Sequence, residues 1–187
     1  MDLKDLEQKI AEYTRQIEEN PNDSDTYNKR GLAYYDLGQY EFAIQNFDKA
    51  VELNPNDVTT HCNRGIFYYD LGQYELAIQN YHKAIEIDPN YANAYFNCGN
   101  TYYRLGQYEL AIQDFDKAVE LNPNYATAYF NCGNSYYESG QYELAIQNYD
   151  KSIELNPNDA AVYRNRGIAY NKLGQKVADV IVMSHKN

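Results

Sequence analysis

The residues best able to do chemistry in this sequence are three histidines and three cysteines, but their spacing predicts neither a metal site nor a catalytic pair. None of His61, His82 and His185 has a cysteine or a second histidine at a metal-ligand spacing, and the chain has no CxxC motif. Neither His61 nor His82 is placed beside a nucleophile, as hydrolytic chemistry requires. We therefore expect a protein that is not an enzyme and that holds no metal or other cofactor.

Two other residue types recur regularly and suit recognition rather than catalysis. One series is Asn63, Asn97, Asn131 and Asn165, and the other is Tyr35, Tyr69, Tyr103 and Tyr137. An asparagine amide both donates and accepts, so it can pair with the backbone of an extended peptide whatever the sequence of that peptide. Tyrosine rings supply large contact areas. Together the two series favour binding of a polypeptide.

Both series have a period of 34 residues, which the five prolines and the ten glycines share. Within one period, such as residues 92–125, apolar residues recur at three- and four-residue spacing on both sides of a Leu-Gly-Gln sequence, which predicts two amphipathic helices. The first helix is expected to end at Leu105-Gly106, because glycine adopts the left-handed conformation cheaply. The second is expected to end before Asn-Pro-Asn, because the residue before proline resists the helical region. Each period is therefore predicted to be a helical hairpin.

With aromatic, Gly, Tyr, Ala and Pro residues at these spacings, the sequence resembles the tetratricopeptide repeat. The resemblance implies an all-α, right-handed solenoid of antiparallel helix pairs with about 4.5 repeats, in which first helices line a concave groove and second helices form the convex back. The predicted parts are an N-terminal capping half-repeat helix at 1–23, repeats at 24–57, 58–91, 92–125 and 126–159, and a partial fifth repeat with a divergent apolar tail at 160–187.

The resemblance places the asparagine and tyrosine series, and the variable positions of the first helices, on the groove. These variable positions include Asn28, Cys62, Phe96, Phe130 and Arg164, and further along Asn100, Asn134 and Ile168. We predict a peptide-binding groove formed by Asn63, Phe96, Asn97, Asn100, Tyr103, Phe130, Asn131, Asn134, Tyr137 and Asn165. If these asparagines lie outside the shared core, replacing Asn97 and Asn131 by Ala weakens peptide binding without changing stability. The alternative, that asparagine is only a common residue of the family at this position, stays open.

The interhelical core is expected to hold small residues such as Gly99, Ala111 and Ala118, with Leu110 and Phe115 supplying bulk. The adjacent tyrosine of each first helix is expected to fill the buried positions, so that the groove tyrosines stay accessible. This second series is Tyr34, Tyr68, Tyr102 and Tyr136.

One known function of the family can be compared position by position. Cochaperone members hold the C-terminal carboxylate of a chaperone with Lys and Arg residues at fixed positions. In the window that starts at the second unit, the clamp positions fall on Cys62, Ile66, Asn97, Thr127 and Asn131. In the window of the third unit, the basic positions are occupied by Phe96, Ala161 and Asn165. The sequence therefore predicts no bidentate carboxylate site.

Charge and hydropathy exclude further classes of partner. The net charge of −11 disfavours a nucleic acid partner, which requires a dense basic face. No apolar run approaches the ~18 residues of a membrane helix, and residues 1–10 lack the apolar core of a signal peptide. We expect a cytoplasmic protein whose three cysteines, Cys62, Cys98 and Cys132, are free thiols.

The interpretation that results is a protein-protein interaction scaffold that binds an extended polypeptide without strong negative charge. Charge along the expected groove changes from acidic to basic, with Asp25, Asp36 and Asp70 first and Arg104, Arg164, Arg166 and Lys172 later. These charges either select the polarity of a ligand or only solvate a surface. The rival interpretation is a self-associating spacer or oligomerisation module with no groove ligand.

The C-terminal segment departs from the repeat and is the predicted site of self-association. After Gly174 no capping helix of the repeat pattern follows, and an apolar, β-branched run stands there instead: Val177, Val180, Ile181, Val182 and Met183. We expect a homodimer through this run or docking of a further domain. Head-to-tail stacking is a second geometry, because segment 1–23 carries seven acidic and three basic residues and segment 160–187 carries one acidic and five basic residues.

Overall fold

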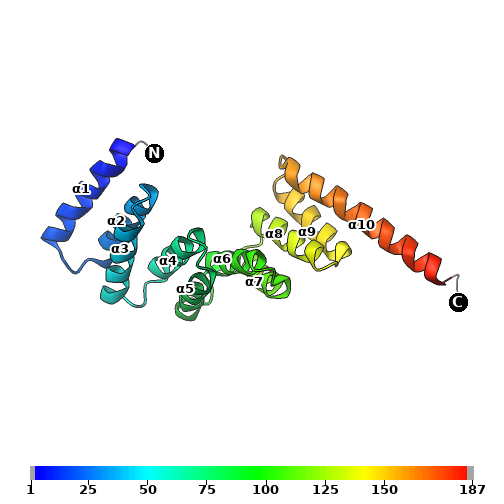
Figure 1. Cartoon of the computed structure of the whole chain (residues 1–187), viewed down its shortest axis with the longest axis horizontal. Helices are drawn as coiled ribbons and strands as arrows, with labels where there is room; N and C mark the ends of the chain where they lie inside the picture. Colours follow the sequence, from blue (N-terminus) through cyan, green and yellow to red (C-terminus); the bar gives the residue numbers. More distant parts are fainter. Residues whose placement is uncertain (1–2, 185–187) are drawn as a thin grey trace. The chain divides into compact units, whose positions relative to one another are not determined.

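The computed structural model describes residues 3–184, with side chains up to residue 175, and these residues form helices only. The helices are α1 (Leu3–Glu19), α2 (Ser24–Asp36), α3 (Tyr40–Leu53), α4 (Val58–Asp70), α5 (Tyr74–Ile87), α6 (Ala92–Arg104), α7 (Tyr108–Leu121), α8 (Ala126–Glu138), α9 (Tyr142–Leu155) and α10 (Ala160–Ser184) (Figure 1). The prediction of an all-α fold is confirmed. None of these described helices is both long enough and apolar enough to cross a membrane.

The chain divides into two compact units, Met1–Ala94 and Tyr95–Asn187, and the division falls inside α6. In the first unit, α2 pairs with α3 and α4 pairs with α5, while α1 packs against α2. In the second unit, α8 pairs with α9, α7 packs against α8, and α10 packs against α9 (Figure 1). Each helix pair is the helical hairpin that the sequence predicts.

Each hairpin turn depends on one glycine in the left-handed conformation, as predicted for Gly106. The φ angle of Gly106 is +73°, and Gly38, Gly72 and Gly140 have nearly the same value. The Gly106 N–H donates to Tyr103 O at 3.0 Å, and the Gln107 N–H donates to Tyr102 O at 2.9 Å. These two bonds form the Schellman motif, which satisfies the last carbonyls of a first helix and reverses the chain.

The two helices of a hairpin meet where a glycine of the first helix lies against an aromatic ring of the second. These contacts pair Gly31 with Phe47, Gly65 with Tyr81, Gly99 with Phe115 and Gly133 with Tyr149. A Cβ atom on Gly99 would lie only 2.9 Å from the Phe115 ring. Glycine therefore permits a close approach that even alanine would obstruct.

The buried aromatic residues are not the ones predicted. The rings that are at most 1% exposed belong to the second helices, at Phe47, Tyr81, Phe115 and Tyr149. Tyr34, Tyr68, Tyr102 and Tyr136 are only half-buried, so the prediction that they fill the core is wrong. Leu110, expected between the helices, is 41% exposed. The space between the helices is too narrow for both, because the glycine contact already places a whole ring there.

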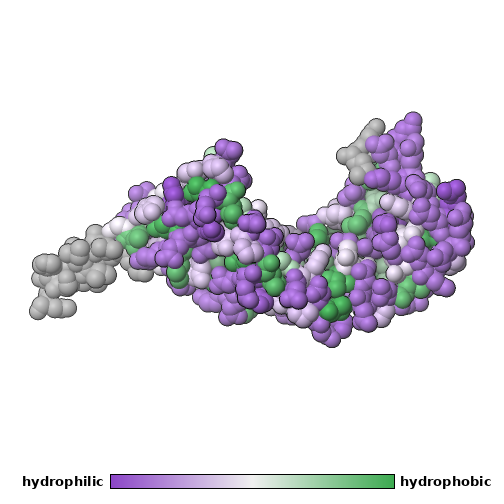
Figure 2. Space-filling view, turned by 180° about the vertical axis from the view of Figure 1, so that it is seen from behind, coloured by the Kyte–Doolittle hydropathy of each residue, from purple (hydrophilic) through white to green (hydrophobic). Residues whose placement is uncertain are grey.

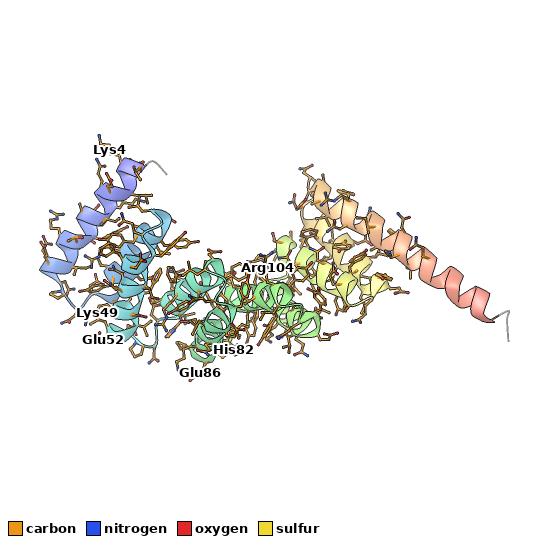
Figure 3. The ribbon with its side chains drawn as sticks, viewed as in Figure 1. Lys4, Lys49, Glu52, His82, Glu86 and Arg104 are labelled. Atoms are coloured by element: carbon orange, nitrogen blue, oxygen red, sulfur yellow. The ribbon has the colours of Figure 1, made fainter. Side chains whose placement is uncertain are left out.

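The surface of the described residues is largely hydrophilic. On the face that Figure 2 shows, hydrophilic residues dominate and apolar residues form small separate patches. Repeated ion pairs cover the second helices: Lys49–Glu52 on α3 and Lys83–Glu86 on α5 have N···O distances of 2.7 Å and 3.0 Å (Figure 3). Such exposed pairs contribute roughly 0.2–0.5 kcal/mol each.

At the N-terminal end, α1 is a helix with a polar outer face. Leu6 and Ile17 are buried, whereas Lys4 and the other charged residues of α1 are exposed (Figure 3). Lys9 and Gln16 stand where α3, α5 and α7 have fully buried alanines, as at Ala43 and Ala50. Long polar side chains at these two positions prevent another first helix from approaching α1 closely, which argues against head-to-tail stacking.

At the C-terminal end, α10 continues through the position where the other first helices turn. Gly174 is not among the glycines with positive φ, and the helix runs on to Ser184. Within the described residues no separate second helix follows Gly174, because α10 itself continues. No atom of the described residues lies within 4 Å of a Cβ built on Gly167, so none of their rings covers this glycine. The predicted self-association residues, Val177, Val180, Ile181, Val182 and Met183, lie outside the described side chains.

The glycine contacts generate a direct test with an internal control. We expect Gly99→Ala to lower the free energy of unfolding by about 1–3 kcal/mol, because the added methyl lies 2.9 Å from the Phe115 ring and 3.2 Å from the backbone oxygen of Ala111. Gly167→Ala meets open space inside a helix and should stabilise the chain by up to about 1 kcal/mol. Urea titration followed by circular dichroism measures both. Equal midpoints for the two variants would contradict the contact.

Candidate functional site

Neighbouring first helices are joined by hydrogen bonds between asparagine side chains, which we call amide pairs. The Nδ2 of Asn131 on α8 donates to the Oδ1 of Asn100 on α6 at 2.7 Å. The Nδ2 of Asn165 on α10 donates to the Oδ1 of Asn134 on α8 at 2.9 Å. In the first unit, Asn63 on α4 donates to Asn28 on α2 at 3.2 Å. The predicted asparagine series is thus partly engaged within the fold.

The amide pairs change the expected role of the asparagines. Asn131 was expected to lie outside the packing, so that its loss would leave stability unchanged. The expected position is wrong, because Asn131 donates to a half-buried Asn100, and we therefore expect loss of Asn131 to lower stability. The predicted series therefore contributes to the contact between repeats, whether or not it also binds a ligand.

A pocket of about 230 Å³ opens on the second unit between the first helices α6, α8 and α10. The lining residues are Tyr103, Asn134, Tyr137, Glu138, Tyr149, Asn165 and Ile168. Four of them belong to the predicted groove: Tyr103, Asn134, Tyr137 and Asn165. The pocket is smaller than the usual pocket for a drug-sized molecule and suits a single side chain.

The amide oxygen of Asn134 organises the base of the pocket. This oxygen accepts hydrogen bonds from the Tyr149 hydroxyl at 2.8 Å and from Asn165 Nδ2 at 2.9 Å. Tyr149 is 1% exposed, and its ring also lies against Gly133. The same side chain therefore fills the hairpin core and holds the orientation of the Asn134 amide.

Two tyrosines and one carboxylate line the rest of the pocket. The Tyr103 ring lies 5.6 Å from the Tyr108 ring, and the Tyr137 ring lies 5.4 Å from the Tyr142 ring, so each is held by the next helix. Burial raises the pKa of Tyr103, and the negative charge of Glu138 raises it further. Burial also raises the pKa of Tyr149, with Tyr103 and Glu138 adding to the shift. The charge of Glu138 thus raises the pKa of both Tyr103 and Tyr149.

The remaining predicted groove residues lie elsewhere. Phe96 packs on Phe115 and on Tyr125, with ring centroids 6.0 Å and 4.7 Å apart, and Phe130 packs on Tyr149 at 6.0 Å. Half-buried Asn97 lies on α6, and the amide pair of Asn100 and Asn131 lies beside the pocket without lining it. Asn63 belongs to the first unit.

The prediction that Asn28 and Cys62 face the groove is wrong. Asn28 is 4% exposed and Cys62 is 3% exposed, so neither presents its side chain to a ligand. Asn28 is instead the acceptor for Asn63. Their positions vary between repeats because they adapt the packing of α2 and α4.

Glu138 and Tyr149 line the pocket but were not among the groove residues predicted from the sequence. Tyr149 occupies the ring position of the second helix, where Phe115 and Phe47 lack a hydroxyl. The sequence signal for this pocket residue was the presence of a tyrosine hydroxyl and of Asn134 in the same repeat, since both side chains are needed to form the hydrogen bond. Glu138 follows Tyr137 at the end of α8, in a position that varies from Asp36 to Lys172 along the chain.

The predicted change of charge along the groove is only partly present. Arg166 pairs with Asp150 on α9 at 2.5 Å, so its charge lies toward the second helix rather than the groove. Asp25 pairs with Lys29 on the same helix at 2.5 Å. Asp70 accepts a hydrogen bond from Tyr35, and this bond raises the pKa of Tyr35 to about 12. Arg166, Asp25 and Asp70 therefore have partners within the chain.

Histidines and cysteines form no cluster of three or more potential metal ligands within the described residues. His82 is exposed on α5 (Figure 3). His61 is buried, and its Nε2 lies 2.9 Å from Pro55 O. Cys62, Cys98 and Cys132 are buried and form no disulfide within the described residues, and burial raises the pKa of the Cys98 and Cys132 thiols. A thiol held neutral in this way is a poor nucleophile.

The family model described as TPR repeat matches residues 31–72, 67–106, 99–140 and 133–174. The chain belongs to the tetratricopeptide repeat family. The matched segments cover more than half of the sequence, and each contains one second helix and the first helix that follows it, or most of that helix. The predicted fold class, an all-α repeat solenoid, is thereby confirmed. Proteins built of these repeats are generally scaffolds for protein interaction rather than enzymes.

Solved structures of tetratricopeptide repeat proteins resemble the chain. A crystal structure of MamA is 26% identical with a TM-score of 0.76 and covers 86% of this chain and 98% of its own. The first TPR of Spaghetti (RPAP3), bound to the HSP90 peptide SRMEEVD, is 27% identical with a TM-score of 0.61 and covers 63% and 93%. YrrB, described as a TPR protein with an unusual peptide-binding site, shares the fold at 24% identity, with a TM-score of 0.73 and coverage of 88% and 85%. A comparison with curated proteins found no significant match.

The bond between Tyr149 and Asn134 can be tested by a double-mutant cycle. Asn134→Ala should lower the free energy of unfolding by about 1–3 kcal/mol, because the hydroxyl of a ring that is 1% exposed loses its acceptor. In a Tyr149→Phe background the same substitution should cost about 0.5–1 kcal/mol less. Urea titrations of the four proteins measure the difference.

A matched control comes from the preceding repeat. Asn100→Ala removes the equivalent amide beside Phe115, which has no hydroxyl, and should cost less than Asn134→Ala. Strictly additive effects of Asn134→Ala and Tyr149→Phe would show that the bond contributes nothing.

Proposed function

We propose that this tetratricopeptide repeat chain is a scaffold that binds an extended segment of a partner protein on its groove face. We define the groove face as the face of α6, α8 and α10 that carries Tyr103, Asn134, Tyr137, Asn165 and Ile168. The observation that carries the proposal is the pocket, because it brings four predicted groove residues from three first helices into one concave surface.

The polar chemistry of the pocket suits a peptide. The Asn134 oxygen is saturated by Tyr149 and Asn165, so its orientation is fixed and its two N–H groups are left to other partners. Within the described side chains, neither of these N–H groups forms a hydrogen bond. A donor held at a fixed orientation beside the half-buried rings of Tyr103 and Tyr137 can bind a peptide carbonyl with little further loss of entropy.

A related structure supports a peptide as the class of ligand, but the acidic character of its peptide does not suit the present chain. The first TPR of Spaghetti (RPAP3) binds the HSP90 peptide SRMEEVD, which is acidic. In the present chain the positions for a carboxylate clamp lack basic residues, and the pocket contains a carboxylate of its own at Glu138. The chain also has a net charge of −11, so the favoured partner is a protein segment that is not strongly acidic. The same charge disfavours nucleic acid. We place this binding in the cytoplasm.

Self-association is a second candidate, and one observation favours it. On α10 the glycine that a second helix would cover is bare, and Tyr163 and Tyr170 are 41% and 53% exposed. A second copy, joined through α10 of each protomer, is the occupant that fits a closed twofold dimer. The polar residues Lys9 and Gln16 on α1 make a head-to-tail array less suitable.

Light scattering during size-exclusion chromatography of the full chain tests this second candidate. A dimer through α10 should lose mass when Tyr163 and Tyr170 are both replaced by Glu, while Lys9→Glu on α1 leaves the mass unchanged. A full chain that stays monomeric at the highest soluble concentration would remove self-association.

Groove binding is tested by selecting linear twelve-residue peptides from a display library on the full chain. We expect selected peptides to bind Ile168→Arg at least about tenfold more weakly, because a long charged side chain then fills the pocket. Ile168 is 42% exposed, so folding should be unaffected. Isothermal titration calorimetry measures the affinities.

The matched control is Tyr170→Arg, the same change to a 53% exposed residue of α10 that does not line the pocket. It should bind the peptides as the unmodified chain does. Selected peptides that bind Ile168→Arg normally, or that lose affinity equally in both variants, would contradict binding on the groove face.

A further inference from the structure

We propose that the pocket on the groove face takes a lysine or arginine side chain of the bound segment. This inference rests on the proposed function and adds the chemistry of the residue that enters the pocket. It is carried by an unpaired carboxylate, two tyrosine faces and an apolar side chain that line the same small volume.

The carboxylate of Glu138 has no partner among the side chains of residues 3–175. At the equivalent position two units earlier in the pattern, Asp70 is engaged by the hydroxyl of Tyr35. Tyr103 stands in the same relation to Glu138 without such a bond. A cation in the pocket would supply the partner that the fold itself does not.

The backbone adds to the negative potential. Glu138 is the last residue of α8, where the unsatisfied carbonyls carry the negative end of the helix dipole. Tyr103 is the penultimate residue of α6, so a second helix ends at the same pocket. Helix C-termini favour positively charged groups by about 0.3–1 kcal/mol each. A carboxylate at the C-terminal end of a helix is repelled by the negative end of the helix dipole. A bound cation would offset this repulsion.

Cations close to the pocket do not cancel this potential. No Lys or Arg lines the pocket. Arg104 lowers the pKa of Tyr103, but burial and Glu138 act in the opposite direction and outweigh it. Lys172, exposed on α10, has no ion pair with Glu138 within the described residues. The carboxylate therefore remains the dominant charge of the pocket.

The tyrosines and Ile168 suit the other parts of such a side chain. A cation over the face of an aromatic ring is attracted by the ring quadrupole. The chain already uses this contact twice, with Arg30 5.5 Å from the Tyr27 ring centroid and Arg166 5.4 Å from that of Tyr163. Ile168 offers apolar surface to the methylene groups that precede the charge.

Three blocked tripeptides differing at one residue test the inference: acetyl-Gly-Lys-Gly-amide and its norleucine and glutamate analogues. Each is titrated into the ¹⁵N-labelled full chain, and backbone amide shifts are followed at residues 134–138 and 165–168. The lysine peptide should shift these resonances and bind about threefold to tenfold more tightly than the norleucine peptide. The glutamate peptide should bind most weakly.

Glu138→Gln should reduce lysine binding to the norleucine level, because it keeps the size of the side chain and removes its charge. Glu154→Gln, an exposed residue of α9 paired with Lys151 at 2.8 Å, is the matched control and should leave the preference intact. Equal binding of lysine and norleucine, or no shift with any tripeptide, would overturn the inference. Such a result leaves groove binding standing if the selected peptides still depend on Ile168.

Discussion

The contact between a glycine of each first helix and an aromatic ring of the following second helix is the constraint on which the hairpins depend. It sets how closely the two helices approach, and it recurs with Phe47, Tyr81, Phe115 and Tyr149. In the last of these contacts the ring bears a hydroxyl that crosses the helix pair to reach Asn134. The candidate site is thus an extension of the core contact rather than an addition to its surface.

The amide pairs give the asparagine series a physical role that does not require a ligand. These directional hydrogen bonds fix how neighbouring first helices are aligned, whereas hydrophobic packing alone leaves that alignment loosely specified. At the Asn134 oxygen, two donors leave no capacity for a peptide N–H, while the N–H groups of the same amide stay available. The Asn134 side chain can therefore have a structural role and a binding role at once. Its oxygen accepts hydrogen bonds within the fold, and its N–H groups are available to a ligand.

Much of the fold follows from the sequence because its signals are local. Helix periodicity, Gly106 and the Asn-Pro-Asn segments act within a few residues, so the hairpins and their turns were predictable. The burial of Tyr149 instead of Tyr136 was not, because it depends on which ring a neighbouring glycine admits. Asn28 and Cys62 were misplaced for a similar reason, since variability between repeats reflects packing as well as binding. The continuation of α10 through Gly174 shows that the glycine permits a turn but does not impose one.

The central claim is that a cationic side chain of a bound segment enters the pocket between α6, α8 and α10. Intermolecular nuclear Overhauser effects between a selected peptide and the isotope-labelled full chain test it most directly. The account predicts contacts from the lysine δ and ε protons of the peptide to the rings of Tyr103 and Tyr137 and to the Ile168 methyl groups. Contacts from those protons only to the exposed second helices, or from an apolar peptide side chain in the pocket, would contradict it.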